Sequence, residues 1–240
     1  TPNYTFSSDE AGTIKYGGSC SSSTTSAISG NNTITFNSLS EGTYSDCTII
    51  VKDSVGNVSN TLAITSFEVI QSYVAVGSSG TLIKSSDGTT WTEITTTAYD
   101  NGSALRGKND ITYGNSTFVT VGGSGTIFTS SNNGTTWTSR SSGTTENLNG
   151  VTYGDDKFFV VGSSGTLIKS SDGTTWTEIT TTAYDNGSAL RGKNDITYGN
   201  STFVTVGGSG TIFTSSNNGT TWTSRSSGTT ENLNGVTYSE

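Results

Sequence analysis

Apolar and polar residues alternate along this chain in short runs, and clusters of glycine, serine, threonine and asparagine separate the runs. In one such run Ile34, Phe36 and Leu39 are expected to face a core. Thr33 and Thr35, between them, are expected to face water, which is the two-residue period of a half-buried β-strand. No window shows the i, i+3, i+4, i+7 spacing of an amphipathic helix. The pattern predicts an all-β fold.

The chain contains a long internal duplication, because residues 76–153 recur letter for letter as residues 161–238. Each copy holds two related units, and each unit contains one tryptophan. The four tryptophans, Trp91, Trp137, Trp176 and Trp222, are 46, 39 and 46 residues apart. A period near 40 residues, built from short β-type runs, is typical of a β-propeller array.

The second unit shows the complete pattern of one propeller blade. Four strands are expected in it, over residues 110–114, 116–122, 125–131 and 135–140. Tight Gly/Asn/Ser turns join them, as in a four-stranded propeller blade. The expected domains are therefore a non-repetitive region, 1–70, and a propeller region of four blades, 71–240.

Residues 1–70 contain several short alternating runs at a spacing that predicts a β-sandwich. The turn that begins at Asp53 is expected to be a hairpin with Gly56 or Asn57 at positive φ. Tyr44 lies three residues before Cys47, close to the tyrosine corner of immunoglobulin-type sandwiches. The region resembles bacterial Ig-like modules found in tandem on surface and secreted proteins, a resemblance that implies a spacer role.

Cys20 and Cys47 are the only cysteines, and their separation matches no zinc or CxxC signature. The two alternatives are a disulfide formed in an oxidising compartment and a pair of buried reduced thiols. We favour the disulfide, and with it an extracellular or bacterial cell-surface location.

Each unit also carries a turn that ends in its tryptophan. Residues 130–137 fit the pattern S-x-D-x-G-x-T-W with Asn132 in the aspartate position, and residues 85–91 give a version one residue shorter with Asp87. A short polar side chain would cap turn amides, glycine would supply the positive φ, and tryptophan would fill the space between blades. The expected turn residues are Ser85, Asp87, Trp91, Ser130, Asn132, Trp137, Ser170, Asp172, Trp176, Ser215, Asn217 and Trp222.

These turns resemble the Asp-box of the BNR/Asp-box propellers, which include sialidases, sortilin-type receptors and photosystem II assembly-factor-like proteins. The resemblance covers about 170 residues and implies the fold. It says little about activity, because Asp-boxes lie away from the active face.

The two ends of the propeller region predict how a ring could close. The first unit has no counterpart of its own to the innermost strand, and the chain ends with a spare copy of that strand at residues 236–238. Since a closed ring leaves no exposed edge, the spare strand could complete the first blade of its own chain, giving a four-bladed ring. It could also complete the first blade of a second copy, giving an eight-bladed homodimer. A third alternative is a segment trimmed from a longer array.

Charge and composition narrow the function classes. The net charge is −8, which argues against nucleic acid as a partner. No apolar stretch approaches the length of a membrane span. The chain has no histidine, and identical repeats place identical residues at equivalent points, whereas one catalytic centre needs different residues in fixed relation. We expect no enzyme activity, and we assign no catalytic residue, no metal site and no cofactor.

Repetition instead suits multivalent binding of a glycan or a protein. The non-strand residues concentrate in the loops 95–110 and 141–150 and in their copies 180–195 and 226–235. The expected ligand contacts are Tyr99, Asp100, Asn101, Arg106 and Lys108 in one copy and Tyr184, Asp185, Asn186, Arg191 and Lys193 in the other. Three readings remain open: these side chains bind a ligand, they only pin the loops in a purely structural array, or the chain is a sialidase-like glycosidase.

Overall fold

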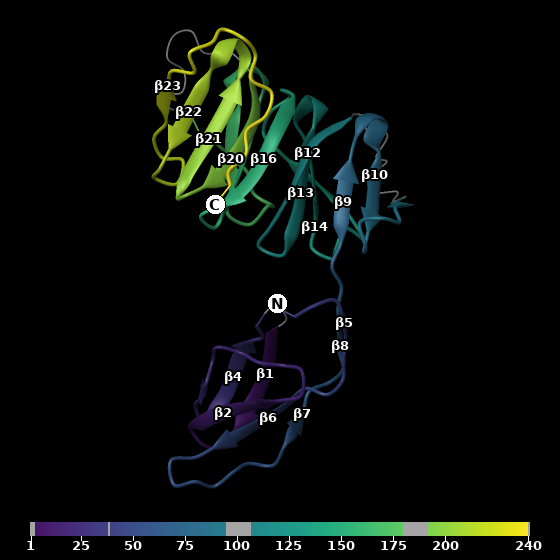
Figure 1. The fold of residues 1–240 in the computed structure, drawn as a ribbon, viewed down its shortest axis with the longest axis vertical. Helices are drawn as coiled ribbons and strands as arrows, with labels where there is room; N and C mark the ends of the chain where they lie inside the picture. Colours follow the sequence, from purple (N-terminus) through teal and green to yellow (C-terminus); the bar gives the residue numbers. More distant parts are fainter. Residues whose placement is uncertain (1–2, 38, 95–106, 180–191, 240) are drawn as a thin grey trace. The chain divides into compact units, whose positions relative to one another are not determined.

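The computed structural model describes residues 3–37, 39–94, 107–179 and 192–239, and the chain divides into two compact units, Thr1–Gln71 and Ser72–Glu240 (Figure 1). Throughout these ranges the regular structure is β-strand, apart from four single-turn 3₁₀ helices. The predicted all-β fold is confirmed. The two units are described separately below.

The first unit contains three antiparallel sheets. One is a two-stranded pair of β1 (Asn3–Ser8) and β4 (Gly30–Thr35). Another is a pair of β5 (Gly42–Tyr44) and β8 (Phe67–Val69). The third has four strands, in the order β3 (Ser26–Ala27), β2 (Gly12–Gly17), β6 (Thr48–Lys52) and β7 (Leu62–Ala63).

One apolar cluster forms the core of the first unit. Ile34 and Phe36 are buried in it, whereas Thr33 and Thr35 are exposed, as the alternation predicts. A disulfide joins Cys20 to Cys47 inside the same cluster, with their Cα atoms 5.3 Å apart. The predicted disulfide is therefore confirmed.

The second unit consists of four antiparallel sheets arranged in chain order (Figure 1). Sheet 1 contains β9 (Tyr73–Val76), β10 (Leu82–Ser85) and β11 (Thr92–Glu93). Sheet 2 contains β12 (Lys108–Gly114), β13 (Thr117–Gly122), β14 (Thr126–Ser130) and β15 (Thr138–Ser141). Sheet 3 contains β16 (Leu148–Gly154), β17 (Lys157–Gly162), β18 (Leu167–Ser170) and β19 (Thr177–Glu178). Sheet 4 contains β20 (Lys193–Gly199), β21 (Thr202–Gly207), β22 (Ile212–Ser215) and β23 (Thr223–Arg225).

Both faces of an inner sheet are apolar, and each face packs against a different neighbour. In β17 successive side chains point to opposite faces. Phe158 and Val160 join the cluster shared with sheet 2, while Phe159 and Val161 join the cluster shared with sheet 4. All four side chains are fully buried. Sheet 3 therefore depends on both neighbours for its burial.

The tryptophans of sheets 2, 3 and 4 each pack against the sheet that precedes their own. Trp137 lies in a cluster with Leu82 of sheet 1 and is 1 % exposed, and Trp222 lies with Phe159 of sheet 3. Trp91 is 42 % exposed. The prediction that every tryptophan fills the space between two blades is wrong for Trp91, because no sheet precedes sheet 1 in the described chain.

Asparagine side chains link the innermost strands of successive sheets. A β-bulge in β12, β16 and β20 interrupts the pairing beside each asparagine, and a bulge re-aims the side chain that it carries. The Asn109 Nδ2 donates to the carbonyl of Leu148 at 2.7 Å, and the Asn149 Nδ2 donates to that of Lys193 at 2.8 Å. Sheet 2 is thereby joined to sheet 3, and sheet 3 to sheet 4.

Two aspartates strengthen this link. Asp110 accepts from the Ile111 amide at 2.8 Å and, across the sheet boundary, from the Val151 amide at 2.7 Å. Asp195 accepts from Val236 at 2.8 Å in the same way. Burial raises the pKa of Asp110 to about 6, the two amide hydrogen bonds oppose that rise, and the charge of Asp195 adds to it.

The C-terminal segment 231–238 follows sheet 4 in the position of a further innermost strand. Residues 236–238 are not paired as a strand, and among the described residues β9 is an edge strand of sheet 1. The alternative of a four-bladed ring within one chain is therefore not what the structure has. The sheets form an open row with sheet 1 at one end and sheet 4 at the other (Figure 1).

We predict that replacing Trp137 will unfold the second unit at lower denaturant concentration. Trp137→Ala removes a fully buried ring and should lower the free energy of unfolding by about 3–5 kcal/mol. Trp137→Phe keeps most of the bulk but loses the 2.9 Å hydrogen bond to the Gly134 carbonyl, so a smaller loss, about 1–2 kcal/mol, is expected. The measurement is urea unfolding followed by tryptophan fluorescence, which reports on the second unit because all four tryptophans lie there. Equal losses in both variants would contradict the packing role of the ring.

A second prediction concerns pH. The folded chain binds a proton on Asp110 near pH 6, whereas an unfolded aspartate does so near 3.8, so the stability should rise as pH falls from 7 to 5. Asp110→Asn removes the titrating group and should abolish that rise, which is on the order of 1–1.5 kcal/mol between pH 7 and pH 5. Urea unfolding at pH 5, 6 and 7 measures it. The same pH dependence in the variant would show that another group is responsible.

Candidate functional site

The second unit has two surface grooves that are lined by duplicated residues, and these are its candidate binding sites. The first is a hollow of about 520 Å³ and the second one of about 600 Å³. The first is lined by Gly125, Arg140, Ser141, Ser142, Gly143, Thr144 and Thr145. The second is lined by the duplicated residues Gly210, Arg225, Ser226, Ser227, Gly228, Thr229 and Thr230. We call them groove 1 and groove 2.

Hydrogen bonds fix the loop that forms each groove. In groove 1 the Thr144 amide donates to Ser142 Oγ at 3.3 Å, and the Glu146 amide donates to Thr144 Oγ1 at 3.1 Å. The Gly125 amide donates to the Glu146 carbonyl at 2.6 Å, and groove 2 repeats that bond from Gly210 to Glu231 at 2.6 Å. The grooves are therefore preorganised and nearly identical.

Glycine is required where the loop meets the 3₁₀ turn η2 (Gly123–Gly125). Gly125 has a φ of +69°, and a Cβ atom there would lie 1.9 Å from the carbonyl oxygen of Thr144. No other residue allows both the positive φ and this close approach. At Gly125, which is buried, groove 1 is thus lined by backbone rather than by a side chain.

One arginine lines each groove, and Arg140 also lines a cavity between sheets 2 and 3, together with Asp172. Arg140 lies at the end of β15, and its Nε donates to Thr129 Oγ1 at 2.9 Å. Arg225 makes the equivalent bond to Thr214 at 2.9 Å. The bond holds Arg140 Nε beside Thr129, which lines that cavity and not groove 1. Sequence reasoning missed Arg140, Thr144 and Thr145 as site residues, although the duplication of the loop 141–150 pointed to the two threonines; Arg140 precedes that loop.

The tryptophan turns lie at the opposite end of the sheets from the grooves, because they join the third and fourth strands. Asp87 Oδ1 accepts from the amides of Thr89 at 2.8 Å and Thr90 at 2.7 Å. The longer turn uses Asn132 Oδ1, which accepts from the Thr136 amide at 2.9 Å. Residues 170–176 repeat the shorter form through Ser170, Asp172 and Trp176, and residues 215–222 repeat the longer one through Ser215, Asn217 and Trp222.

Hydrogen bonding inside the turns also sets their electrostatics. The Thr90 and Thr89 amides lower the pKa of Asp87 well below its usual range. The Thr174 hydroxyl and the Thr175 amide do the same for Asp172. Since these carboxylates are bonded within their own turns, the turns have a structural role.

Most of the expected ligand contacts lie outside the described residues. These are Tyr99, Asp100, Asn101, Arg106, Tyr184, Asp185, Asn186 and Arg191. Lys108 is the first residue of β12. Lys193 begins β20, is fully buried, and has its Nζ 5.1 Å from the centre of the Phe213 ring. That position differs from the exposed loop position that the sequence predicts for it.

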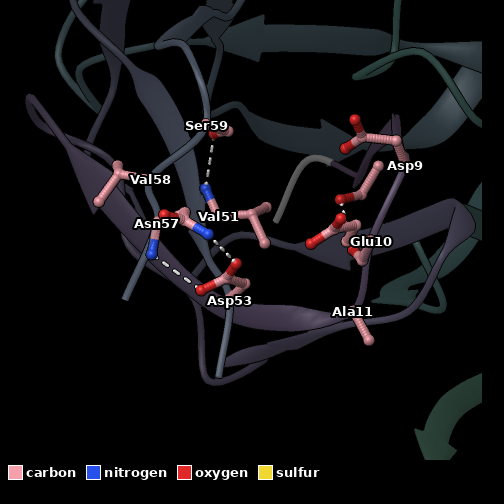
Figure 2. A pocket seen from close by; sticks show the side chains of 9 residues that line it. Asp9, Glu10, Ala11, Val51, Asp53, Asn57, Val58 and Ser59 are labelled. Carbon is pink, nitrogen blue, oxygen red and sulfur yellow. Dashed lines mark hydrogen bonds between the residues drawn. The ribbon is translucent and has the colours of Figure 1, made fainter. Parts of the chain in front are cut away.

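The first unit has a cavity of about 230 Å³ beside the hairpin that follows β6 (Figure 2). Asp9, Glu10 and Asp53 line it. Asp53 Oδ1 accepts from the Gly56 amide at 2.7 Å and Oδ2 accepts from Asn57 Nδ2 at 2.7 Å. Partial desolvation raises the pKa of Asp53, but the hydrogen bonds from Asn57, Gly56 and Val55 outweigh it and hold the pKa below its usual value. This carboxylate stabilises its own turn, in which Gly56 has the predicted positive φ, +105°.

Two kinds of feature are absent from the described residues. In those ranges no group of three or more His, Cys, Asp or Glu side chains is arranged to hold a metal ion. Nor does any helix there have the length and apolarity needed to cross a membrane.

Comparison with solved structures gives distant neighbours. YCF48 bound to a D1 peptide has a TM-score of 0.48 and 16 % identity, over 77 % of this chain and 63 % of that one. YCF48 from Cyanidioschyzon merolae has a TM-score of 0.46 and 14 % identity, over 74 % and 66 %. A GH74 enzyme from Niastella koreensis has a TM-score of 0.39 and 19 % identity, over 76 % and 30 %. The chain thus spans less than two thirds of the length of each of these structures.

No curated protein matches the chain. The sequence profile of the DUF6242 β-propeller domain matches residues 97–235. That match takes in more than half of the chain, and it includes sheets 2, 3 and 4 with both grooves. The chain therefore belongs to the DUF6242 β-propeller domain family.

Proposed function

We propose that this chain is a non-catalytic binding module, in which the propeller sheets present two equal grooves to one multivalent ligand. The observation that carries the proposal is the identity of the grooves: the same residues, held by the same hydrogen bonds, occur at two equivalent places. Two linked equal sites raise avidity without any new type of contact.

The groove chemistry favours a ligand that carries carboxylates. Each groove offers hydroxyl groups, backbone and one guanidinium, and no aromatic residue lines either of them. Arginine binds a carboxylate through two parallel hydrogen bonds. An acidic glycan and an acidic protein segment share this chemistry, and both remain the proposed ligand class.

The duplication also argues against catalysis. A catalytic centre holds an acid, a base or nucleophile, and charge-stabilising groups in one fixed relation. The groove residues are instead the same at both places, and each groove contains a single ionisable side chain. Turnover of a fluorogenic sialoside by the purified chain would count against this part of the proposal.

We further infer that the first unit is an Ig-like spacer. Its Tyr44 hydroxyl donates to the Ser40 carbonyl at 2.9 Å, and this bond supports the assignment because the tyrosine of a tyrosine corner bonds to backbone a few residues upstream. Its disulfide suits an oxidising compartment, so we place the protein outside the cell or on a bacterial cell surface. We also assign the tryptophan turns as Asp-boxes, because a short polar side chain caps the amides of each turn. On that assignment the four sheets are propeller blades. A second copy of the chain is the proposed protein partner for the ends of the row.

The test of groove function is binding to immobilised acidic and neutral glycans and to acidic peptides. The double variant Arg140→Ala/Arg225→Ala should lose binding to the acidic ligands, by about tenfold or more. Each single variant should keep one site and lose mainly avidity. Lys157→Ala removes one positive charge at the opposite end of the sheets, beside the turn between β16 and β17, and should bind as the unaltered chain does.

Comparing binding to acidic glycans with binding to acidic peptides shows which of the two ligand classes supplies the carboxylate. Tyr99→Ala/Tyr184→Ala tests the neighbouring loops in the same assay. Loss of binding in that variant, with the arginine variant unchanged, would move the site away from the grooves. Binding to neutral glycans alone would overturn the carboxylate assignment.

A further inference from the structure

We propose that the cavity between sheets 2 and 3 binds one neutral sugar ring, held between Arg140 of sheet 2 and Asp172 of sheet 3. The cavity has a volume of about 270 Å³, and side chains of both sheets line it. This site is separate from groove 1, although Arg140 lines both. The proposal does not depend on what the grooves bind.

The outer strands of sheet 2 present a polar margin to sheet 3. Residues opposite each other on antiparallel strands lie on the same face of a sheet. Arg140 lies opposite Ile127, and Thr138 lies opposite Thr129. Since Ile127 belongs to the apolar cluster between sheets 2 and 3, Arg140, Thr138 and Thr129 continue that same face beyond its apolar part.

The tryptophan turn of sheet 3 forms the opposite wall of the cavity. Gly173 in this turn lies against sheet 2, because a Cβ atom on it would be 3.6 Å from Val119 Cγ2 and 3.7 Å from Thr117 Cγ2. This contact places Asp172 and Thr174, on either side of Gly173, at the cavity. Both walls are thus built from hydrogen-bonded elements, which lowers the entropic cost of binding.

Hydrogen-bond donors are concentrated on the sheet 2 wall. Arg140 Nε donates to Thr129 Oγ1 at 2.9 Å, and no described residue accepts a hydrogen bond from the Nη atoms of Arg140. Thr129 is only 4 % exposed. Its hydroxyl accepts the bond from Arg140, and no described residue accepts a bond from it in turn. Because an unpaired buried donor is costly, a ligand oxygen at this point would be stabilising.

The sheet 3 wall offers a negative charge. Asp172 Oδ1 accepts from the amides of Thr174 at 2.7 Å and Thr175 at 2.9 Å. The Thr174 hydroxyl and these amides hold the pKa of Asp172 well below its usual range, and no part of this lowering comes from Arg140. The two opposite charges therefore line one cavity without forming an ion pair, and a ligand can lie between them.

The two charges favour an uncharged ligand that carries hydroxyl groups. An anion beside Arg140 would be repelled by Asp172, and a cation beside Asp172 would be repelled by Arg140. A hydroxyl group both donates and accepts. The hydroxyls of one ligand can thus accept from Arg140 and Thr129 and donate to Asp172.

The size of the cavity suits a single ring. Its volume of about 270 Å³ is the share of about nine water molecules in the liquid. Sites for larger, drug-sized ligands measure roughly 300–1,000 Å³. A neutral sugar ring, with hydroxyl groups on most of its carbons, therefore matches both the size and the chemistry of the cavity.

The other two junctions between neighbouring sheets carry different side chains at the same places. The counterparts of Thr129, Arg140 and Asp172 are Lys84, Ile94 and Asn132 between sheets 1 and 2, and Lys169, Ile179 and Asn217 between sheets 3 and 4. Among the three junctions of the described sheets, an arginine therefore faces an aspartate at one. The site is a property of this junction, and the stacking of sheets does not by itself require it.

The first test is calorimetric titration of the whole chain with neutral sugars. Glucose, galactose, mannose and N-acetylglucosamine are the free ligands, and their methyl glycosides represent the end of a glycan. At least one of them should bind with a dissociation constant of about 1–10 mM, at one site per chain. Binding of the methyl glycoside as well as the free sugar would identify the end of a glycan as a ligand source, and binding of the free sugar alone a monosaccharide.

The charge on the sheet 3 wall is tested by Asp172→Asn. An amide oxygen can still accept from the turn amides, as Asn132 does in the longer turn, but the charged acceptor is lost. Sugar binding should weaken by about tenfold or more. Asp87→Asn is the matched control, because it makes the same change in the identical turn of sheet 1, outside the cavity. It should leave sugar binding unchanged.

The sheet 2 wall is tested by Thr129→Lys/Arg140→Ile. This double variant introduces the residues that sheet 3 carries at the same positions, Lys169 and Ile179, so the fold should persist. A melting temperature close to that of the unaltered chain checks this. Sugar binding should be lost.

Three results would each overturn the proposal. They are the absence of binding by every sugar and glycoside, binding of glycine or acetate in their place, and equal weakening by Asp172→Asn and Asp87→Asn. The grooves are assayed separately with acidic ligands and Arg225→Ala, which changes no residue of the cavity. A chain that binds acidic ligands but no neutral sugar would therefore refute this inference and leave the proposed function standing.

Discussion

The burial of each sheet's two apolar faces against its neighbours is the constraint on which the rest of the second unit depends. A single four-stranded sheet with Phe158 and Val160 on one face and Phe159 and Val161 on the other cannot bury both faces alone. Stacking is what makes such a unit stable, and it makes each repeat dependent on the next. The exposed large apolar side chains described in this unit lie in sheet 1, in the adjoining strand β12 or in the C-terminal segment; these are Tyr73, Trp91, Tyr113 and Tyr238.

Hydrogen bonds between the innermost strands add to the apolar contacts that hold neighbouring sheets together. Asn109 and Asp110 connect one sheet to the backbone of the next, so the sheets are joined by directed bonds as well as by apolar contact. Directed bonds fix the register between sheets, which apolar packing alone would leave less defined. The raised pKa of Asp110 follows from its place inside this junction.

The same rigid stacking determines what the grooves can do. The loop after the fourth strand is held to the 3₁₀ turn of its own sheet through Gly125 and Glu146. Its hydroxyls and Arg140 are thus presented by a fixed scaffold, which lowers the entropic cost of binding. Duplication of the scaffold duplicates the groove, and this is why we favour repeated recognition over a single reaction centre.

Much of the fold could be predicted from the sequence alone. Alternation placed Ile34 and Phe36 in the core of the first unit, the repeat period placed the strands of the sheets, and the cysteine count pointed to the bond between Cys20 and Cys47. These features are local or compositional, so the chain itself carries the information. The candidate site was less predictable: the grooves form where two loops of one sheet meet, and no motif marks that meeting.

Tertiary structure decided which side chains are buried, because burial depends on which sheets lie beside them. Trp91 and Trp176 lie in identical stretches of sequence, yet Trp91 is exposed while Trp176 packs against sheet 2. Lys193, expected on a surface loop, is buried over Phe213. The sequence determined which sheet faces are apolar, and which residues can form turns or accept hydrogen bonds from turn amides. Only the folded row of sheets determined which of those faces are covered, because identical residues have different burial when different sheets lie beside them.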